Sequence, residues 1–238
     1  TTADNNTAVG LRALSANTTA DNNTAVGMNA MLVSSTGADN VAVGFSALVA
    51  NTTGGDNIAI GSQALLANTT GGDNVAVGTD AMQANTTGAD NVAVGKDAML
   101  ANTTGVNNVS IGNISLIGNT TGSRNTAIGA ESMNDNTTAD NNTAIGYASL
   151  SKNTTGTSNT ALGWAALEVN TTASNNIAVG HAALRSNTTG TRLIAIGYAA
   201  LDGQDTENDN IAIGYNTMTT NNAGGEANVV MGSYAGDA

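Results

Sequence analysis

Four aromatic residues and the only histidine of the chain recur at every seventeenth position. They are Tyr147, Trp164, His181, Tyr198 and Tyr215, and each directly follows a glycine. If the chain coils with the same period, these side chains lie above one another and form a stripe along one edge. Aromatic faces pack on sugar rings and on apolar surfaces, so the stripe is a candidate surface-binding track. The alternative is that the rings pack against a neighbouring chain or against one another.

A series of aspartates follows the same spacing in the first half of the chain. The series is Asp39, Asp56, Asp73 and Asp90. Carboxylates stacked about 5 Å apart repel one another by roughly 1 kcal/mol or more, and calcium ions between them would relieve that repulsion. However, the dense aspartate spacing of known calcium loops is absent. We therefore favour solvated turn aspartates and expect no cofactor, with calcium as the alternative.

The triplet Asn-Thr-Thr recurs ten times, and each copy is formally an N-glycosylation site. The candidate acceptors in the first half are Asn51, Asn68, Asn85, Asn102 and Asn119. The same residues also favour turns in a protein that carries no glycan, because their side chains hydrogen-bond to the nearby backbone. We prefer that interpretation. Ice binding is a further hypothesis for the regular threonines. It is disfavoured because ice-binding faces need outward threonines at alternate strand positions, whereas these threonines are adjacent.

The residues needed for a catalytic site are scarce. The chain has one histidine and no cysteine, and we find no phosphate-binding loop. Its acidic residues belong to repeated positions rather than to a cluster of different residue types. The sequence therefore predicts a protein that is not an enzyme.

The elements that must position these side chains come from one repeated motif, whose fullest form is Asn-Val-Ala-Val-Gly. The motif glycines are Gly10, Gly27, Gly44, Gly61, Gly78, Gly95, Gly112, Gly129, Gly146, Gly163, Gly180, Gly197, Gly214 and Gly232. Each is the seventeenth residue after the one before it, except Gly232, which is the eighteenth. A fixed period of this size predicts an all-β parallel β-solenoid (β-roll) of about fourteen coils. Positions are numbered below from the motif glycine, which is position 0.

Each coil is predicted to contain two short strands and two turns. Positions −3 to −1 form a β-branched run closed by glycine, which is typical of a short strand. Positions +3 and +4, a small residue followed by Leu or Met, predict a second strand. Helix is the alternative for this second segment, but the segment is too short and lacks caps. Asn-Thr-Thr at +7 predicts the second turn.

Coil stacking predicts which side chains meet. Neighbouring coils should pair in parallel at about 4.8 Å, and the asparagines at −4 and +7 should form ladders of side-chain amides. We expect the large residues at −1 and +4 inside the coil and the alanine at −2 outside; the reverse assignment of the two faces stays open. In either case one apolar strand face needs a cover, which predicts oligomerisation, with a three-chain assembly as the natural candidate.

Composition excludes several classes of partner. The net charge is −12, aromatic residues make up 3% of the chain and charged residues 10%. Nucleic acid and anionic membranes need basic patches, and the six Lys and Arg residues form no cluster. No apolar run is long enough to span a bilayer, so we expect no membrane insertion.

The motifs Asn-Val-Ala-Val-Gly and Asn-Ile-Ala-Ile-Gly resemble the head repeats of YadA-like trimeric autotransporter adhesins and similar arrays in bacteriophage tail-fibre proteins. The resemblance covers the chain from Asn6 to Gly232. It implies a left-handed, trimeric β-roll that is displayed outside the cell or on a virion and is used for adhesion. The adhesin repeat is usually shorter than this one, and the extra length coincides with the Asn-Thr-Thr-Gly turn.

These observations together predict a structural and adhesive repeat domain of an extracellular or virion fibre. Its partners would be other copies of the chain and a host-surface glycan or protein. The alternative is a dedicated ligand-binding solenoid for glycan, calcium or ice. We expect one repeat domain over residues 1–238, regular to 214 and divergent over 215–238, as a fragment of a longer fibre.

Overall fold

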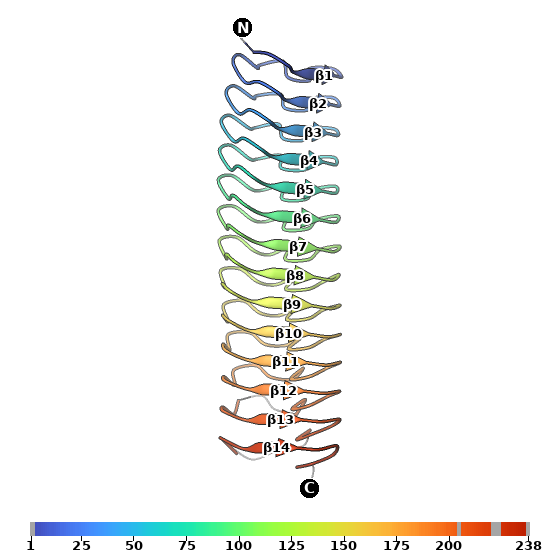
Figure 1. The fold of residues 1–238 in the computed structure, drawn as a ribbon, viewed down its shortest axis with the longest axis vertical. Helices are drawn as coiled ribbons and strands as arrows, with labels where there is room; N and C mark the ends of the chain where they lie inside the picture. Colours follow the sequence, from blue (N-terminus) through green and yellow to red (C-terminus); the bar gives the residue numbers. More distant parts are fainter. Residues whose placement is uncertain (1–2, 204–205, 220–224, 237–238) are drawn as a thin grey trace. The chain divides into compact units, whose positions relative to one another are not determined.

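The structure, a computed structural model, describes residues 3–203, 206–219 and 225–236. The chain divides into two compact units, Thr1–Gly122 and Ser123–Ala238. Each unit is all-β in its described part and is a stack of coils that each contribute one strand, which confirms the predicted parallel β-solenoid. Figure 1 shows the coils, with one short strand in each.

The fourteen strands of the described residues are each three residues long and begin three residues before a motif glycine. The first unit contains β1 (Thr7–Val9), β2 (Thr24–Val26), β3 (Val41–Val43), β4 (Ile58–Ile60), β5 (Val75–Val77), β6 (Val92–Val94) and β7 (Val109–Ile111). The second unit contains β8 (Thr126–Ile128), β9 (Thr143–Ile145), β10 (Thr160–Leu162), β11 (Ile177–Val179), β12 (Ile194–Ile196), β13 (Ile211–Ile213) and β14 (Val229–Met231).

Successive strands within each unit pair in parallel, as predicted, and like residues lie side by side. Ala42 of β3 pairs with Ala59 of β4, and Ala178 of β11 pairs with Ala195 of β12. The pairing follows the sequence period until β14, where Val230 lies beside Ala212 and the offset is one residue longer. Every outward position therefore becomes a column of equivalent side chains along the unit.

The second predicted strand, at +3 and +4, is wrong, because this segment is a turn. Gln63 at +2 and Leu65 at +4 are in the left-handed region, with φ of +59° and +51°. The N–H of Gln63 donates back to Phe45 at 2.9 Å, whereas the N–H of Leu65 donates forward to Ala81 at 3.0 Å. Alternating left-handed residues thus satisfy the backbone from both neighbouring coils without a strand, at a cost of about 1–2 kcal/mol for each such residue.

In the coils of β2 to β13, the interior is filled by one long side chain and two small ones. Leu65 at +4 is fully buried, as predicted, and so are Ala59 at −2 and Ala64 at +3. The prediction that position −1 points inward is wrong, because Ile58 and Ile60 are 38% and 39% exposed. The coil is too thin to hold a β-branched residue opposite Leu65, so alanine lines the inner face of the strand.

The motif glycine is required by the backbone at the end of each strand. Gly78, for example, has a φ of +144°, which L-residues rarely adopt. A β-carbon on Gly78 would also collide with the carbonyl oxygen of Gly95 in the next coil. The chain therefore turns sharply after each strand, and the residue at +1 is the first outward side chain beyond the turn.

Candidate functional site

Two ladders of buried asparagines hold the turns in place and set the geometry of the outer columns. In the −4 ladder, the N–H of Asn57 donates to Oδ1 of Asn40 at 2.9 Å. In the +7 ladder, Nδ2 of Asn68 donates to Oδ1 of Asn51 at 3.1 Å. Both predicted ladders are confirmed, and buried amides of this kind are stable only because their hydrogen bonds are made.

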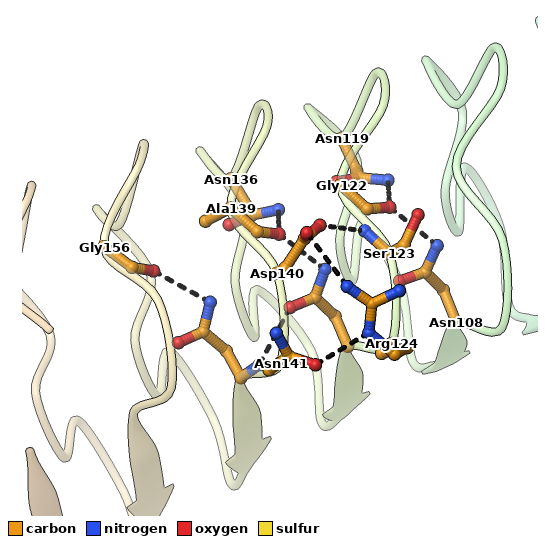
Figure 2. A network of polar contacts seen from close by, with 12 residues as sticks. Asn108, Asn119, Gly122, Ser123, Arg124, Asn136, Ala139, Asp140, Asn141 and Gly156 are labelled. Atoms are coloured by element: carbon orange, nitrogen blue, oxygen red, sulfur yellow. Dashed lines mark hydrogen bonds and ion pairs between the residues drawn. The ribbon is translucent and has the colours of Figure 1, made fainter. Parts of the chain in front are cut away.

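The two ladders meet at the carbonyl of position +10. Nδ2 of Asn108 and Nδ2 of Asn119 donate to the carbonyl oxygen of Gly122 at 2.9 and 3.0 Å. Figure 2 shows this convergence and its repeats in the coils that follow, such as Nδ2 of Asn136 donating to Ala139 at 3.3 Å. In each coil that carries both asparagines, one turn carbonyl thus accepts a hydrogen bond from each ladder.

The candidate glycosylation sites are the same +7 asparagines that make these hydrogen bonds. Asn51, Asn68, Asn85, Asn102 and Asn119 are all fully buried. Glycan transfer needs an exposed side-chain nitrogen, whereas Nδ2 of Asn85 donates to Asn68 at 2.8 Å and to Gly88 at 3.0 Å. The folded solenoid therefore disfavours a glycan at these sites, and the triplets act as turn residues.

The outer face of the strands, hereafter the sheet face, consists of positions −3 and −1. These positions are Val, Ile, Leu, Met or Thr in every coil. None of the six Lys and Arg or 18 Asp and Glu residues lies at −3, −2 or −1. Each unit therefore presents a continuous uncharged surface of side chains such as Ile177, which is 40% exposed, and Ile196, which is 39% exposed.

The aromatic stripe is assembled in the second unit at position +1. The rings of Trp164 and His181 have centroids 4.6 Å apart, and His181 lies 5.0 Å from Tyr198, with interplanar angles of 16° and 12°. Tyr147 and Tyr215 extend the stack at 6.4 Å from Trp164 and 5.0 Å from Tyr198. The five predicted residues thus form one stacked column, hereafter the aromatic column.

Stacking determines which parts of the rings are accessible. Trp164, His181 and Tyr198 have a ring against each face, yet Trp164 and Tyr198 remain 43% and 46% exposed. The exposed area must then come mainly from ring edges. The column can offer a ligand edges that carry phenol hydroxyls, an indole N–H and imidazole nitrogens.

One end of the aromatic column is joined to a carboxylate. The hydroxyl of Tyr147 donates to Oε1 of Glu131 at 3.1 Å. This hydrogen bond, with the negative charge of Glu131, raises the pKa of the Tyr147 hydroxyl above its ordinary value. Tyr147 therefore stays protonated as a donor over a wider pH range.

Sequence reasoning missed one ring that contacts the end of the aromatic column. Tyr234 lies at +2 of the last coil, one position away from the other rings, and its ring contacts Tyr215 edge-on at 5.4 Å and 65°. Its place at +2, where the other rings are at +1, hid this contact. Phe45, the one aromatic residue at +1 in the first unit, has Met28 and Ser62 as its column neighbours.

The aspartate column lies along the turn at +12. Asp39, Asp56, Asp73 and Asp90 are exposed and have φ near +58°. In the described residues, no three His, Cys, Asp or Glu side chains are grouped as metal ligands would be. The carboxylates thus form a single row along the surface, one in each coil. Calcium binding there stays a hypothesis.

In the second unit the same turn carries cations that pair with the next coil. Nε and Nη2 of Arg192 donate to the two carboxylate oxygens of Asp209 at 2.6 and 2.8 Å, which lowers the pKa of Asp209. Arg124 donates to Asp140 at 3.1 Å and to Asn141 at 2.8 Å (Figure 2). These exposed pairs favour the native register between neighbouring coils more than they add stability.

In the described ranges there is no enclosed pocket. Those ranges also hold no helix with the length and apolar character needed to cross a membrane. Comparison of the chain with protein-family models, curated proteins and solved structures finds no match. The case for a function therefore comes from two surfaces, the sheet face and the aromatic column.

Proposed function

We propose that this chain is a structural and adhesive repeat domain of an extracellular or virion fibre, and that its copies associate through the sheet face. A left-handed, three-chain assembly fits the resemblance of the repeat to YadA-like adhesin heads. The observation that carries the proposal is the sheet face itself, which is uncharged, mostly apolar and repeated in every coil.

Physical chemistry supports burial of the sheet face. Long contiguous apolar surfaces on soluble proteins usually mark an interface. Each coil of a solenoid presents the same patch of side chains as its neighbours. Association of identical copies would therefore bury the patches of all coils at once. The charges lie elsewhere on the coils, and contact along the sheet face therefore brings no like charges into the interface.

The test is the oligomeric mass in solution by light scattering. We expect a trimer for the native chain and a monomer for the double variant Ile194→Lys with Ile196→Lys, which places ammonium groups on the sheet face. Thr172→Lys, on an exposed turn of the same unit, is the matched control and should remain a trimer. A native chain that is monomeric at all concentrations would refute self-association.

The aromatic column supports a second candidate function, a solenoid that binds glycan directly. Its stacked rings present a row of polar and apolar edges at intervals of 4.6 to 6.4 Å. Sugars present hydroxyls and C–H groups at similarly short intervals, and such edges can bind both.

Ser substitution at the four aromatic members of the column tests this candidate. Replacing Tyr147, Trp164, Tyr198 and Tyr215 should abolish attachment to glycan-coated surfaces. Phe45→Ser, which removes an aromatic ring outside the column, should leave attachment unchanged. If attachment and thermal stability both survive the fourfold change, the column has neither a binding nor a packing role.

A further inference from the structure

Three of the four tyrosines of the chain are ring neighbours at one end of the aromatic column. Tyr198 and Tyr215 are stacked, with ring centroids 5.0 Å apart and an interplanar angle of 13°. Tyr234 contacts Tyr215 edge-on at 5.4 Å. The fourth tyrosine, Tyr147, has Trp164 as its ring neighbour. The three adjoining tyrosines, hereafter the tyrosine cluster, therefore bring like phenol rings together in successive coils.

The backbone holds the members of the tyrosine cluster beside one another. The N–H of Asn216, the residue after Tyr215, donates to the carbonyl oxygen of Tyr198 at 2.8 Å. The N–H of Tyr234 donates to the carbonyl oxygen of Tyr215 at 2.9 Å. Tyr198 and Tyr215 also follow β12 and β13, which pair residue for residue. Equivalent carbons of these two stacked rings are therefore about one coil spacing, or about 5 Å, apart.

The ring edges of the tyrosine cluster are open to solvent. All three side chains are exposed, and within the described residues their hydroxyls make no hydrogen bond. The hydroxyl of Tyr147, in contrast, donates to Glu131. Exposed side chains rotate on the picosecond-to-nanosecond timescale, so neighbouring rings can turn the carbons beside their hydroxyls toward each other. An oxidant in solution therefore has access to phenols that are both unbonded and adjacent.

We propose that the tyrosine cluster is a site of oxidative cross-linking, at which Tyr215 is joined to a neighbouring tyrosine of the same chain as dityrosine. The oxidant is hydrogen peroxide, acting through a haem peroxidase. This inference goes beyond the proposed function and does not rest on self-association, because both rings belong to one chain.

The reaction takes one electron and the phenolic proton from each of two rings, which gives two phenoxyl radicals. The radicals join through one new carbon–carbon bond between the carbons ortho to the two oxygens. Each of these carbons then loses its hydrogen as a proton, and each oxygen takes up a proton, which restores both phenols. Hydrogen peroxide accepts the two electrons and two protons and is reduced to two molecules of water. The product therefore lacks two hydrogen atoms.

Two features favour coupling within a chain over coupling between chains. Rings that are held side by side react as if at a very high local concentration, because the encounter has already been made. The net charge of −12 also opposes the approach of a second chain. The cross-link should therefore form even in dilute protein.

The cross-link would supply a covalent bond between coils that this chain cannot obtain from a disulfide, because it has no cysteine. Joining Tyr198 to Tyr215 closes a loop of one period and restricts the unfolded chain, as a disulfide does. We expect the melting temperature of the cross-linked chain to rise by roughly 5 °C or more.

Oxidation of dilute, purified full-length chain with hydrogen peroxide and a haem peroxidase tests the proposal. We expect dityrosine fluorescence in a band of monomer mass on a denaturing gel. Cleavage at acidic residues such as Asp209 and Glu226 separates the three tyrosines of the cluster onto different peptides. Mass spectrometry should then find the Tyr215 peptide joined to that of Tyr198 or Tyr234, with two hydrogen atoms lost.

Conservative variants show whether the cluster is the site. Tyr215→Phe keeps the stacked ring but leaves Tyr198 and Tyr234 two coils, or about 10 Å, apart, so the yield of dityrosine within the chain should fall roughly tenfold or more. The double variant Tyr198→Phe with Tyr234→Phe removes both partners and should lose as much. Tyr147→Phe is the matched control, because it removes one tyrosine from outside the cluster and should leave the yield unchanged.

The outcomes separate this inference from the proposed function. Equal yields in the native chain and in Tyr215→Phe, or dityrosine found only between chains, would overturn the cross-linking site. A trimer by light scattering that forms no dityrosine within a chain would overturn this inference and leave self-association standing. A monomer that forms the cross-link at Tyr215 would refute self-association and support the inference.

Discussion

At the scale of single residues, one position among the described residues interrupts the +7 asparagine ladder. Ser34 occupies the place between Asn17 and Asn51 and is fully buried. Its hydroxyl is the one buried side-chain polar atom among the described residues that has no hydrogen-bond partner. A serine is too short to reach the turn carbonyl that asparagine bonds in other coils, as Asn51 does to Gly54 at 2.8 Å.

Restoring the asparagine should stabilise the protein. Ser34→Asn can donate to the carbonyl of Gly37 and accept from Nδ2 of Asn51, so we expect the free energy of unfolding to rise by about 1 kcal/mol. Urea denaturation followed by circular dichroism measures the change. Thr36→Asn, on the exposed side of the same turn, should change it little. A fall in stability for Ser34→Asn would mean that the amide does not fit there.

The carboxylate of Glu131 should control the titration of Tyr147. Because the pKa of Tyr147 is raised, the contribution of the pair to stability is present below the ordinary tyrosine pKa and is lost as pH rises through the higher folded value. We expect Glu131→Gln to lower the pH at which Tyr147 ionises, as followed by NMR of labelled tyrosine. Glu168→Gln, which removes a weaker charge effect, should lower it less. An unchanged titration in Glu131→Gln would show that the hydrogen bond does not form.

At the scale of the coil, backbone conformation is fixed at many positions at once. Each coil combines a three-residue strand, a glycine with strongly positive φ and two left-handed residues at +2 and +4. Such residues are unfavourable alone and persist where surrounding structure determines them. Here the surrounding structure is the bonding to the coils on both sides, so a coil is stable only within its stack.

The motif glycine should tolerate no side chain. Gly78→Ala adds a strained φ and a collision with Gly95, and we expect the free energy of unfolding to fall by about 3 kcal/mol or more. Gly55→Ala is the matched control, because its β-carbon would lie 3.3 Å from the oxygen of Ala38 and alanine already occupies the same position in other coils. Thermal melting compares the two. Equal losses would show that backbone conformation is not the cause.

Features that depend on equivalence between coils could be predicted from the sequence. The parallel pairing, the asparagine ladders and the stacking of residues such as Trp164 on His181 all follow from the constant period. The inner and outer faces of the strand could not, because Ala and Val are both apolar. Only the narrow space opposite residues such as Leu65 decides that alanine is inside. The second strand was predicted wrongly because left-handed residues such as Gln63 carry no sequence signature.

At the scale of the molecule, charge and apolar surface occupy different positions of the coil. The net charge of −12 opposes association in general, whereas the sheet face is neutral. Salt screens repulsion between exposed charges and does not weaken apolar contact.

Self-association should therefore strengthen with ionic strength. We expect the dissociation constant of the oligomer to fall as sodium chloride is raised from low to physiological concentration, as measured by analytical ultracentrifugation. The Ile194→Lys and Ile196→Lys variant should remain monomeric throughout. An oligomer that dissociates as salt is added would indicate an interface made of ion pairs rather than of the sheet face.

The constant offset between paired strands has a consequence for how such a chain changes in length. Removing one whole period, for example residues 62–78, rejoins Gly61 to Thr79 and restores every column, with the same partners on both sides. Removing one residue between Asn57 and Asn68 instead would put the two asparagine ladders out of register with each other. Gains and losses of whole periods in the coding sequence therefore keep every column intact, so the number of coils can vary between generations while the architecture of each coil is inherited unchanged. The one extra residue in the series lies between the last two strands, β13 and β14.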